Sequence, residues 1–355
     1  MNGGDVSIYT YQGSTYTGTS SSSGSTGGWG GFGGRPGGGM QEGNSNKVDI
    51  SAKGIKAVGL YDEAGTTWQS KGNITINGGT LNIDSSDDAI HCGGDMFLYG
   101  GTYTLASADD AAHSDHNLTI GKGSANTYDD VMITVTKAYE GIEGQNITQN
   151  SGTVLVTSTD DGFNAAGGSD GSGSGNPGGP GGFQWGQGGM STSGGSYLMT
   201  FNGGLALVNI SDGDHDGFDS NGDIKMNGGY QISNGSEPFD CGDSGNSVSV
   251  NGSTWVNNYN SVMGDCLRNS ASVSATGKST SANSRVSLVG SDGKVIVSFV
   301  LGKSVSNFYA GGANAKSGSA FYSGGTVSGG TEVSSTDGKQ VVYIGGTLSN
   351  GTKLG

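Results

Sequence analysis

Acidic residues recur in this chain within a short tetrad made of an acid, a small residue, an apolar residue and a polar residue. The steps between successive copies are 22, 30, 21, 55 and 21 residues, counted between first acids. An upstream copy, Lys53-Gly54-Ile55-Lys56, inverts the charge. The six acidic copies are Asp88-Ala89-Ile90-His91, Asp110-Ala111-Ala112-His113, Glu140-Gly141-Ile142-Glu143, Asp161-Gly162-Phe163-Asn164, Asp216-Gly217-Phe218-Asp219 and Glu237-Pro238-Phe239-Asp240.

Repeated acids of this kind predict a row of calcium sites, provided that the tetrads stack on one another. Neighbouring strands lie about 4.7–4.9 Å apart, and two charges at about that distance repel by roughly 3 kcal/mol at an effective dielectric near 20. Calcium–oxygen distances of about 2.3–2.6 Å would place one Ca²⁺ between two stacked carboxylates. The expected ligands are Asp87, Asp88, Asp109, Asp110, Glu140, Glu143, Asp160, Asp161, Asn164, Asp214, Asp216, Asp219, Glu237 and Asp240.

Other interpretations of these residues stay open. Asp and Asn also occupy corners because they tolerate left-handed backbone and cap turns. His91, His113 and His215 suit calcium poorly, so we expect them to hydrogen-bond within the stack, with a transition-metal site as the alternative. Lys53 and Lys56 are expected to end the stack by pairing with the acids of the next repeat.

The elements that must position these acids are short strands joined by tight corners. A second motif, exemplified by Asn77-Gly78-Gly79-Thr80, keeps the same phase as the tetrads and is flanked by alternating runs such as Ile74-Thr75-Ile76. Gly accounts for 73 residues, against roughly 25 at an average usage of about 7%. A repeat of roughly 20–25 residues with two or three short strands predicts an all-β, right-handed parallel β-helix.

The repeat also predicts how the chain is organised. Residues 1–45 read as a Gly-rich N-terminal segment, 46–274 as the parallel β-helix with a Gly-rich loop insertion at 169–195, and 275–355 as a small C-terminal antiparallel β cap. In the last of these, Asp292-Gly293 between alternating runs is a hairpin signal. A cap is expected because the open end of a solenoid must be covered.

Charge and composition exclude several classes of partner. The formal net charge of −15 repels nucleic acid. The chain has no apolar run of 18 residues, which argues against membrane insertion. The first residues lack a basic, then apolar, signal-peptide pattern. The sequence does not indicate an oligomeric state.

These motifs resemble a family of bacterial secreted β-helix carbohydrate-binding proteins that bind cellulose and acidic sugars such as polygalacturonate. The resemblance rests on Lys53-Gly54-Ile55-Lys56-Ala57, Asp87-Asp88-Ala89-Ile90-His91, Asp160-Asp161-Gly162-Phe163-Asn164-Ala165 and the segment from Asp292 to Phe299. It covers roughly residues 46–330. It implies a pectate-lyase-like fold, bound Ca²⁺ and an extracellular or cell-surface location.

Three functions follow as expectations. The first is a non-catalytic, calcium-binding protein that recognises a plant cell-wall polysaccharide, with Trp29, Trp185, Tyr128 and Tyr139 as candidate sugar-stacking residues. The second is a calcium-dependent polysaccharide (pectate) lyase, which needs a positioned base. Its candidate bases are Lys53, Lys56, Lys137 and Arg268. The third is a structural or adhesive surface protein with purely structural calcium. The distributed acids favour the first over an enzyme.

Overall fold

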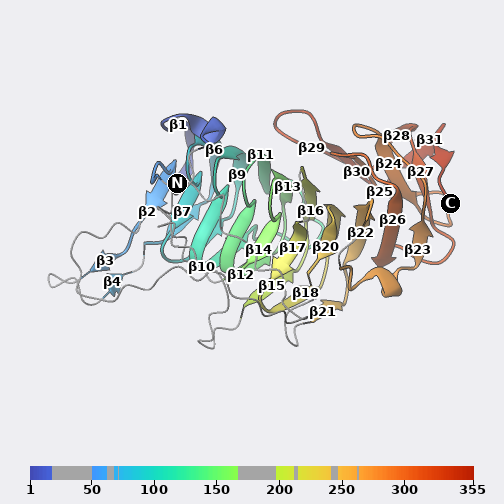
Figure 1. The fold of residues 1–355 in the computed structure, drawn as a ribbon, viewed down its shortest axis with the longest axis horizontal. Coiled ribbons are helices and arrows are strands. Elements are labelled where there is room, and N and C mark those ends of the chain that lie inside the picture. Colours follow the sequence, from blue (N-terminus) through green and yellow to red (C-terminus); the bar gives the residue numbers. More distant parts are fainter. Residues whose placement is uncertain are drawn as a thin grey trace, which may run out of the picture.

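The computed structural model describes residues 1–17, 50–61, 68–70, 72–166, 197–211, 215–240, 247–261 and 264–355. Within these ranges the protein is all-β, with parallel sheets and no α-helix; two short 3₁₀ helices, η1 (Gly13–Thr15) and η2 (Arg268–Ser270), are the only helical turns. The expected Gly-rich insertion at 169–195 and most of the segment 1–45 lie outside the described residues. Figure 1 shows the strands side by side in a row, with the two termini at opposite ends.

The first parallel sheet begins with the N-terminal strand and follows the repeat. Its strands pair in parallel until the last two, which pair in antiparallel fashion, so that β26 reverses the direction at the C-terminal end. The described order is β1 (Asn2–Tyr9), β6 (Gly78–Ser85), β9 (Gly101–Ser107), β11 (Val131–Lys137), β13 (Thr153–Ser158), β16 (Leu205–Ile210), β19 (Tyr230–Asn234), β22 (Thr254–Tyr259), β26 (Asn307–Gly312) and β23 (Val273–Ala275).

The second sheet carries the tetrads and is parallel throughout. Its main path is β2 (Ile55–Ala57), β7 (Ile90–Cys92), β10 (Ala112–Ile120), β12 (Ile142–Gln149), β14 (Phe163–Ala165), β17 (Asp216–Ser220) and β20 (Glu237–Phe239). The same sheet contains further strands that lie off this path and pair in parallel with β10, with β12 or with one another. They are β5 (Ile74–Ile76), β8 (Met96–Leu98), β15 (Leu198–Phe201), β18 (Asp223–Met226) and β21 (Val248–Val250). A separate pair, β3 (Leu60–Tyr61) and β4 (Trp68–Ser70), lies beside the first repeat.

The chain alternates between these two sheets, so each repeat adds one strand to the first sheet and one or two strands to the second. Their facing residues form one apolar core, because alternate side chains of a strand point to the same side. Leu81, Leu105, Ile133 and Val154 enter it from the first sheet, and Phe163 enters from the second. The predicted alternating run Ile74-Thr75-Ile76 corresponds to strand β5, and the alternating residues Leu81-Asn82-Ile83 after the corner lie in strand β6.

The Asn-Gly-Gly corners are held by an asparagine ladder. The side-chain amide of Asn202 donates to Asn150, that of Asn227 to Asn202 and that of Asn251 to Asn227, at 2.9–3.0 Å. The second glycine has positive φ, for example +78° at Gly204, where a Cβ would lie 2.4 Å from the Gly152 carbonyl oxygen. The motif therefore marks corners at which only glycine fits.

The C-terminal part forms an antiparallel sheet with the described order β29 (Thr331–Ser334), β30 (Val341–Ile344), β25 (Val295–Val300), β24 (Arg285–Val289), β27 (Ala320–Ser323) and β32 (Thr352–Lys353), beside a small pair, β28 (Thr326–Ser328) and β31 (Thr347–Ser349). Strands β24 and β25 form the hairpin predicted at Asp292-Gly293.

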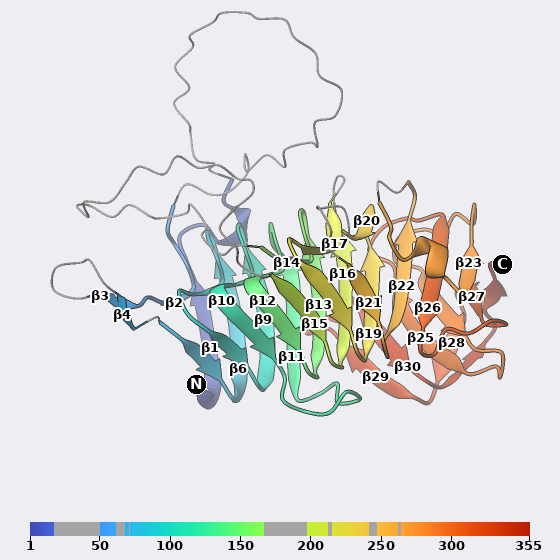
Figure 2. The same cartoon turned by 90° about the horizontal axis from the view of Figure 1, so that it is seen from below.

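This antiparallel sheet packs on the outer face of the first parallel sheet. The second core cluster joins Leu207 and Ile232 of the parallel sheet to Leu288 and Phe299 of the antiparallel one. Figures 1 and 2 show β29 and β30 lying along the flank of the stacked strands. The antiparallel part is thus more than a cover for the end of the stack, because it also shields one side of it.

Candidate functional site

Strand register places the six acidic tetrads in line. The apolar positions pair as Ile90 with Ala112, Ala112 with Ile142, and Ile142 with Phe163, and Phe218 continues the row. The polar positions pair in the same register: Lys56, His91, His113, Glu143, Asn164 and Asp219. The acids at the first position stack as well, because the backbone N–H that follows each one bonds to the carbonyl of the next acid.

We call the predicted ligands that the structure describes the acid column. It comprises Asp87, Asp88, Asp109, Asp110, Glu140, Glu143, Asp160, Asp161, Asn164, Asp216, Asp219, Glu237 and Asp240. The remaining predicted ligand, Asp214, lies outside the described residues. The small second residue of each tetrad has a steric cause: a Cβ on Gly162 would lie 2.3 Å from Val208 of the facing sheet. Small residues thus let the corner approach the core and fix where the acids project.

At its N-terminal end the column contains its own cations. The Lys53 side chain is 1% exposed, and its Nζ lies 2.9 Å from Asp87 Oδ1 and 2.5 Å from Asp88 Oδ2. This confirms the predicted pairing for Lys53; Lys56 is exposed on the same strand region. Burial and the neighbouring Asp88 raise the pKa of Asp87, while Lys53 opposes the shift.

Two histidines continue this neutralisation. His91 Nδ1 lies 2.7 Å from Asp88 Oδ2, and the His91 and His113 rings stack with centroids 4.7 Å apart. His113 Nδ1 lies 3.1 Å from Asp110 Oδ2 and 3.0 Å from Glu143 Oε2. Burial alone would lower the pKa of His113, but Glu143 and Asp110 outweigh it and hold that pKa well above its usual value. The histidines therefore bond within the column, as predicted.

Asp115 is a further member of this group that the tetrad pattern does not contain. Its Oδ1 lies 3.1 Å from His91 Nε2 and 3.5 Å from His113 Nε2. The register of β10 shifts between Ser114 and Asn117, and this irregularity turns Asp115 back toward the two rings. In the sequence, Asp115 is recognisable only as an acid that lies two residues after the end of a tetrad.

At the C-terminal end, acids face acids. Burial and the charges of Asp219 and Asp216 raise the pKa of Asp161 well above its usual value. His215 Nδ1 contacts Asp160 Oδ1. Asn164 donates to Glu140 Oε2 at 3.1 Å. Its own Oδ1 is buried without a hydrogen-bond donor. Oxygen atoms therefore predominate in this part of the column.

Four trios of side chains bring their donor atoms within 4.8 Å of one another among the described residues. Two are purely carboxylate and have the oxygen ligands that calcium prefers: Asp87, Asp88 and Asp109, and Asp216, Asp219 and Asp240. Two include imidazole nitrogen, which suits transition metals better: Asp88, His91 and His113, and Asp110, His113 and Glu143.

Three of the four candidate lyase bases are engaged in contacts with other parts of the protein. Lys53 is held by its two aspartates, Lys137 donates from Nζ to the Ser14 carbonyl, and Arg268 lies 5.3 Å from the Tyr309 ring centroid. Lys56 differs from the other three candidate bases. Its side chain is exposed beside the column, and the described residues show no ion pair, hydrogen bond or ring contact for it.

The candidate sugar-stacking residues are distributed differently. Trp29 and Trp185 lie outside the described residues. Tyr128 is only 8% exposed and packs toward Tyr230, with centroids 6.4 Å apart, and Tyr139 is half-buried. Sequence reasoning did not single out Tyr9 and Tyr11, which are 66% and 65% exposed. In the sequence, apolar Val6 and Ile8 alternate with polar residues, and this alternation predicts a strand that would place Tyr9 on its outer side.

The fold and the column define an all-β protein with parallel sheets and a buried acidic stack. A family model described as a carbohydrate-binding domain-containing protein matches residues 1–111. This similarity supports a carbohydrate-binding role and a polysaccharide as the partner class. No curated protein and no solved structure matches the chain. No helix among the described residues has the length and apolar character needed to cross a bilayer.

Proposed function

We propose that this chain is a non-catalytic, extracellular carbohydrate-binding protein whose acid column holds Ca²⁺. Its ligand is a plant cell-wall polysaccharide, either cellulose or a polygalacturonate-type acidic sugar. The match over residues 1–111 supports the carbohydrate-binding part. The stacked oxygen ligands support the calcium part.

The observation that carries the calcium proposal is the orphaned oxygen of Asn164. This residue stacks between Glu143 and Asp219 and is 8% exposed, yet its Oδ1 has no donor. A buried acceptor without a partner costs about 1–3 kcal/mol. A cation at this level would satisfy that oxygen and offset the mutual repulsion that raises the pKa of Asp161. Glu140, Asp161 and Asp219 would hold it together with Asn164.

Calcium also supplies a reason why a chain with a formal charge of −15 could bind an anionic polymer. Three carboxylates around one Ca²⁺ leave a net charge of about −1 instead of −3, so a divalent ion lowers the repulsion that a uronate carboxylate would meet. Residues of the column would position the ion, and the polymer carboxylate would complete its coordination.

The fold part of the proposal is a right-handed parallel β-helix. Its support is the alternation of the chain between two parallel sheets, with each strand pairing with its counterpart from the preceding repeat. Parallel strands joined by a crossover within one sheet are right-handed in about 98% of cases. The same handedness would apply at every repeat.

Co-sedimentation with polygalacturonate tests the proposal. We expect the protein to sediment with the polymer in calcium, to remain in the supernatant in chelator, and to generate no ultraviolet absorbance from unsaturated uronate product. Asp219→Asn combined with Asp240→Asn should abolish sedimentation. Asp292→Asn combined with Asp129→Asn, which likewise removes two charges but at exposed positions, should not. Product absorbance would replace the proposal with a lyase, and binding unaffected by chelator or by the column variant would leave calcium a structural role.

A further inference from the structure

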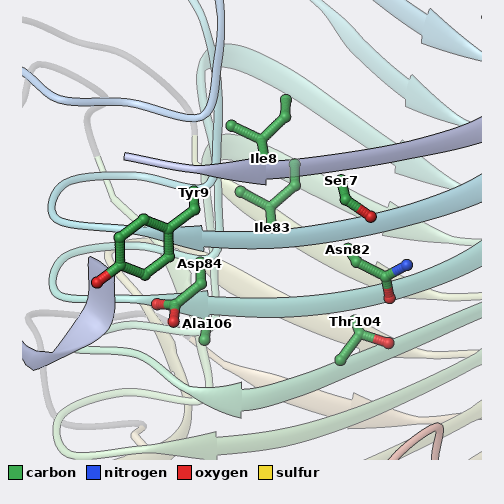
Figure 3. A pocket seen from close by; sticks show the side chains of 8 residues that line it. All are labelled: Ser7, Ile8, Tyr9, Asn82, Ile83, Asp84, Thr104 and Ala106. Carbon is green, nitrogen blue, oxygen red and sulfur yellow. The ribbon is translucent and has the colours of Figure 1, made fainter. Parts of the chain in front are cut away.

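The outer face of the first parallel sheet carries a groove at its N-terminal end, remote in sequence from most of the acid column. It has a volume of about 350 Å³ and crosses β1, β6 and β9. Figure 3 shows Ser7, Asn82 and Thr104 in one row across these strands, and Tyr9 beside Asp84 at the other end of the groove. The remainder of this sheet face further along is covered by the antiparallel sheet.

A ladder of polar side chains forms the floor of the groove. Ser7 pairs in register with Asn82, and Asn82 with Thr104, so their side chains project to the same side of three adjacent strands. Ser7 and Asn82 are exposed, and Thr104 is half-buried because its hydroxyl donates to Thr336 at 2.7 Å. The strand spacing of about 4.7–4.9 Å is close to the advance of one sugar residue along an extended β-linked chain. Each strand can therefore offer hydrogen bonds to one sugar.

An exposed aromatic ring stands at the end of the ladder. Among the described residues only three large hydrophobic side chains are strongly exposed, and Tyr9 and Tyr11 are two of them. Tyr9 pairs in register with Asp84, and a Cβ at Gly13 would lie 2.7 Å from the Tyr9 ring, so the turn at Gly13 packs against one edge of it. Tyr11 adopts φ +49°, an unfavourable conformation for a bulky residue. The chain thus leaves about two thirds of each tyrosine exposed to water, and this aromatic surface gains nothing from burial.

The charge of the groove selects the kind of sugar. Asp84 is its only carboxylate, and no lysine or arginine lines it. The Asp84 Oδ1 already accepts from the Ser14 N–H at 2.6 Å, which fixes the carboxylate in place as an acceptor for sugar hydroxyls. An anionic uronate would meet a like charge here, whereas a neutral pyranose offers hydroxyls to the ladder and a C–H face to Tyr9.

We infer that this groove binds one chain of a neutral, β-linked polysaccharide, laid across β1, β6 and β9 with a sugar ring stacked on Tyr9. The inference rests on the proposed function and gives it a second binding surface, separate from the calcium-bearing column. Every lining residue falls between Ser7 and Ala106, inside the range 1–111 that the carbohydrate-binding family model matches. The hairpin tip at Thr336 is bonded to Thr104 and so lies beside the β9 side of the groove.

Isothermal titration with cellohexaose in calcium-containing buffer tests the groove. Tyr9→Ala should weaken binding about tenfold, the size of a stacking contact, while Tyr9→Phe keeps the ring and stays within about twofold of the wild type. Asn82→Ala should weaken binding about threefold to tenfold, as expected for one lost hydrogen bond. Val58→Ala removes a side chain that is 65% exposed outside the groove and serves as the matched control. Circular dichroism verifies that each variant is folded.

The outcomes separate the groove from the proposed function. Unchanged affinity in Tyr9→Ala and Asn82→Ala would overturn the groove, as would a wild-type protein that does not bind cellohexaose. In the latter case, sedimentation with polygalacturonate in calcium would still uphold the proposed function, and its absence would remove both. Unchanged cellohexaose binding in Asp219→Asn, together with weaker binding in Tyr9→Ala, supports two independent surfaces.

Discussion

The two ends of the acid column share one tetrad pattern but differ in how their charge is balanced. At the N-terminal end, Lys53, His91 and His113 lie against the carboxylates of the first repeats. At the C-terminal end, Asp216, Asp219 and Asp240 converge within 4.8 Å, and Asp161 is surrounded by other acids. The comparison teaches that one tetrad pattern can place cationic side chains among the carboxylates at one end and mainly carboxylates at the other, where we propose that Ca²⁺ binds.

The largest effect is expected at the internal cation. Lys53→Met leaves Asp87 and Asp88 buried without their ammonium partner, and breaking such a pair costs about 3–5 kcal/mol. Urea unfolding in chelator should show a free energy of unfolding lower by that amount. Lys56→Met, an exposed neighbour, should stay within about 0.5 kcal/mol of the wild type. If the two variants lowered the free energy of unfolding equally, the ion pairs of Lys53 with Asp87 and Asp88 would not be a main source of stability.

Calcium should act on the other end of the column. At a free concentration about 100-fold above its Kd, an ion bound only by the native state adds about 2.7 kcal/mol to the free energy of unfolding. Thermal unfolding with and without calcium measures this gain. The Asp219→Asn, Asp240→Asn double variant should lose it, and in chelator it should be at least as stable as the wild type because the acid repulsion is relieved. A full calcium gain in the double variant would place the ion elsewhere.

His113→Asn would make the N-terminal end resemble the C-terminal one. It removes the imidazole between Asp110 and Glu143 and should lower the free energy of unfolding by roughly 2 kcal/mol. The variant should also gain more stability from calcium than the wild type does, because an oxygen-lined, uncompensated site is created. If calcium restores nothing beyond the wild-type gain, the histidine is a packing residue and the comparison loses its electrostatic basis.

The smallest perturbation uses the free thiol Cys92 as a reporter of the N-terminal end. Cys92 is fully buried next to His91, and burial raises the pKa of its thiol, so the reactive thiolate is scarce in the native state. Iodoacetamide should label it slowly, and chelator should not accelerate the labelling. Lys53→Met should accelerate it. Peptide mass spectrometry identifies the labelled site, and chelator-driven labelling of Cys92 would show that this end also depends on calcium.

The alignment of the tetrads could be predicted from the sequence because a repeat fixes register. Once Ile90, Ile142 and Phe163 are assigned to one inward position, the acids two residues earlier must stack. Lys53 follows in the same way from its inverted tetrad. Its role in balancing the charge of the first acids is visible in the contacts with Asp87 and Asp88, whereas calcium binding by the column stays a prediction.

Other features could not be predicted from the sequence and are visible only in the folded chain. Asp115 reaches the histidines only through the irregular register of β10, which no repeat encodes. Strand β1 pairs with β6 more than 70 residues away, so the groove is assembled across a Gly-rich stretch that carries no periodic signal. The packing of the antiparallel sheet on the outer face of the first sheet is indicated in the sequence by Leu205-Ala206-Leu207-Val208. This run is apolar at every position, as expected of a strand buried on both faces.

The hairpin of β29 and β30 has a mechanical consequence. Its tip bonds to Thr104 of β9 and Thr134 of β11, while its base belongs to the sheet that packs on β16 and β19. A load that pulls the repeats apart along their row must therefore shear this brace while it opens the hydrogen-bonded strands. The two resist in parallel, so the rupture force should exceed that of the repeats alone.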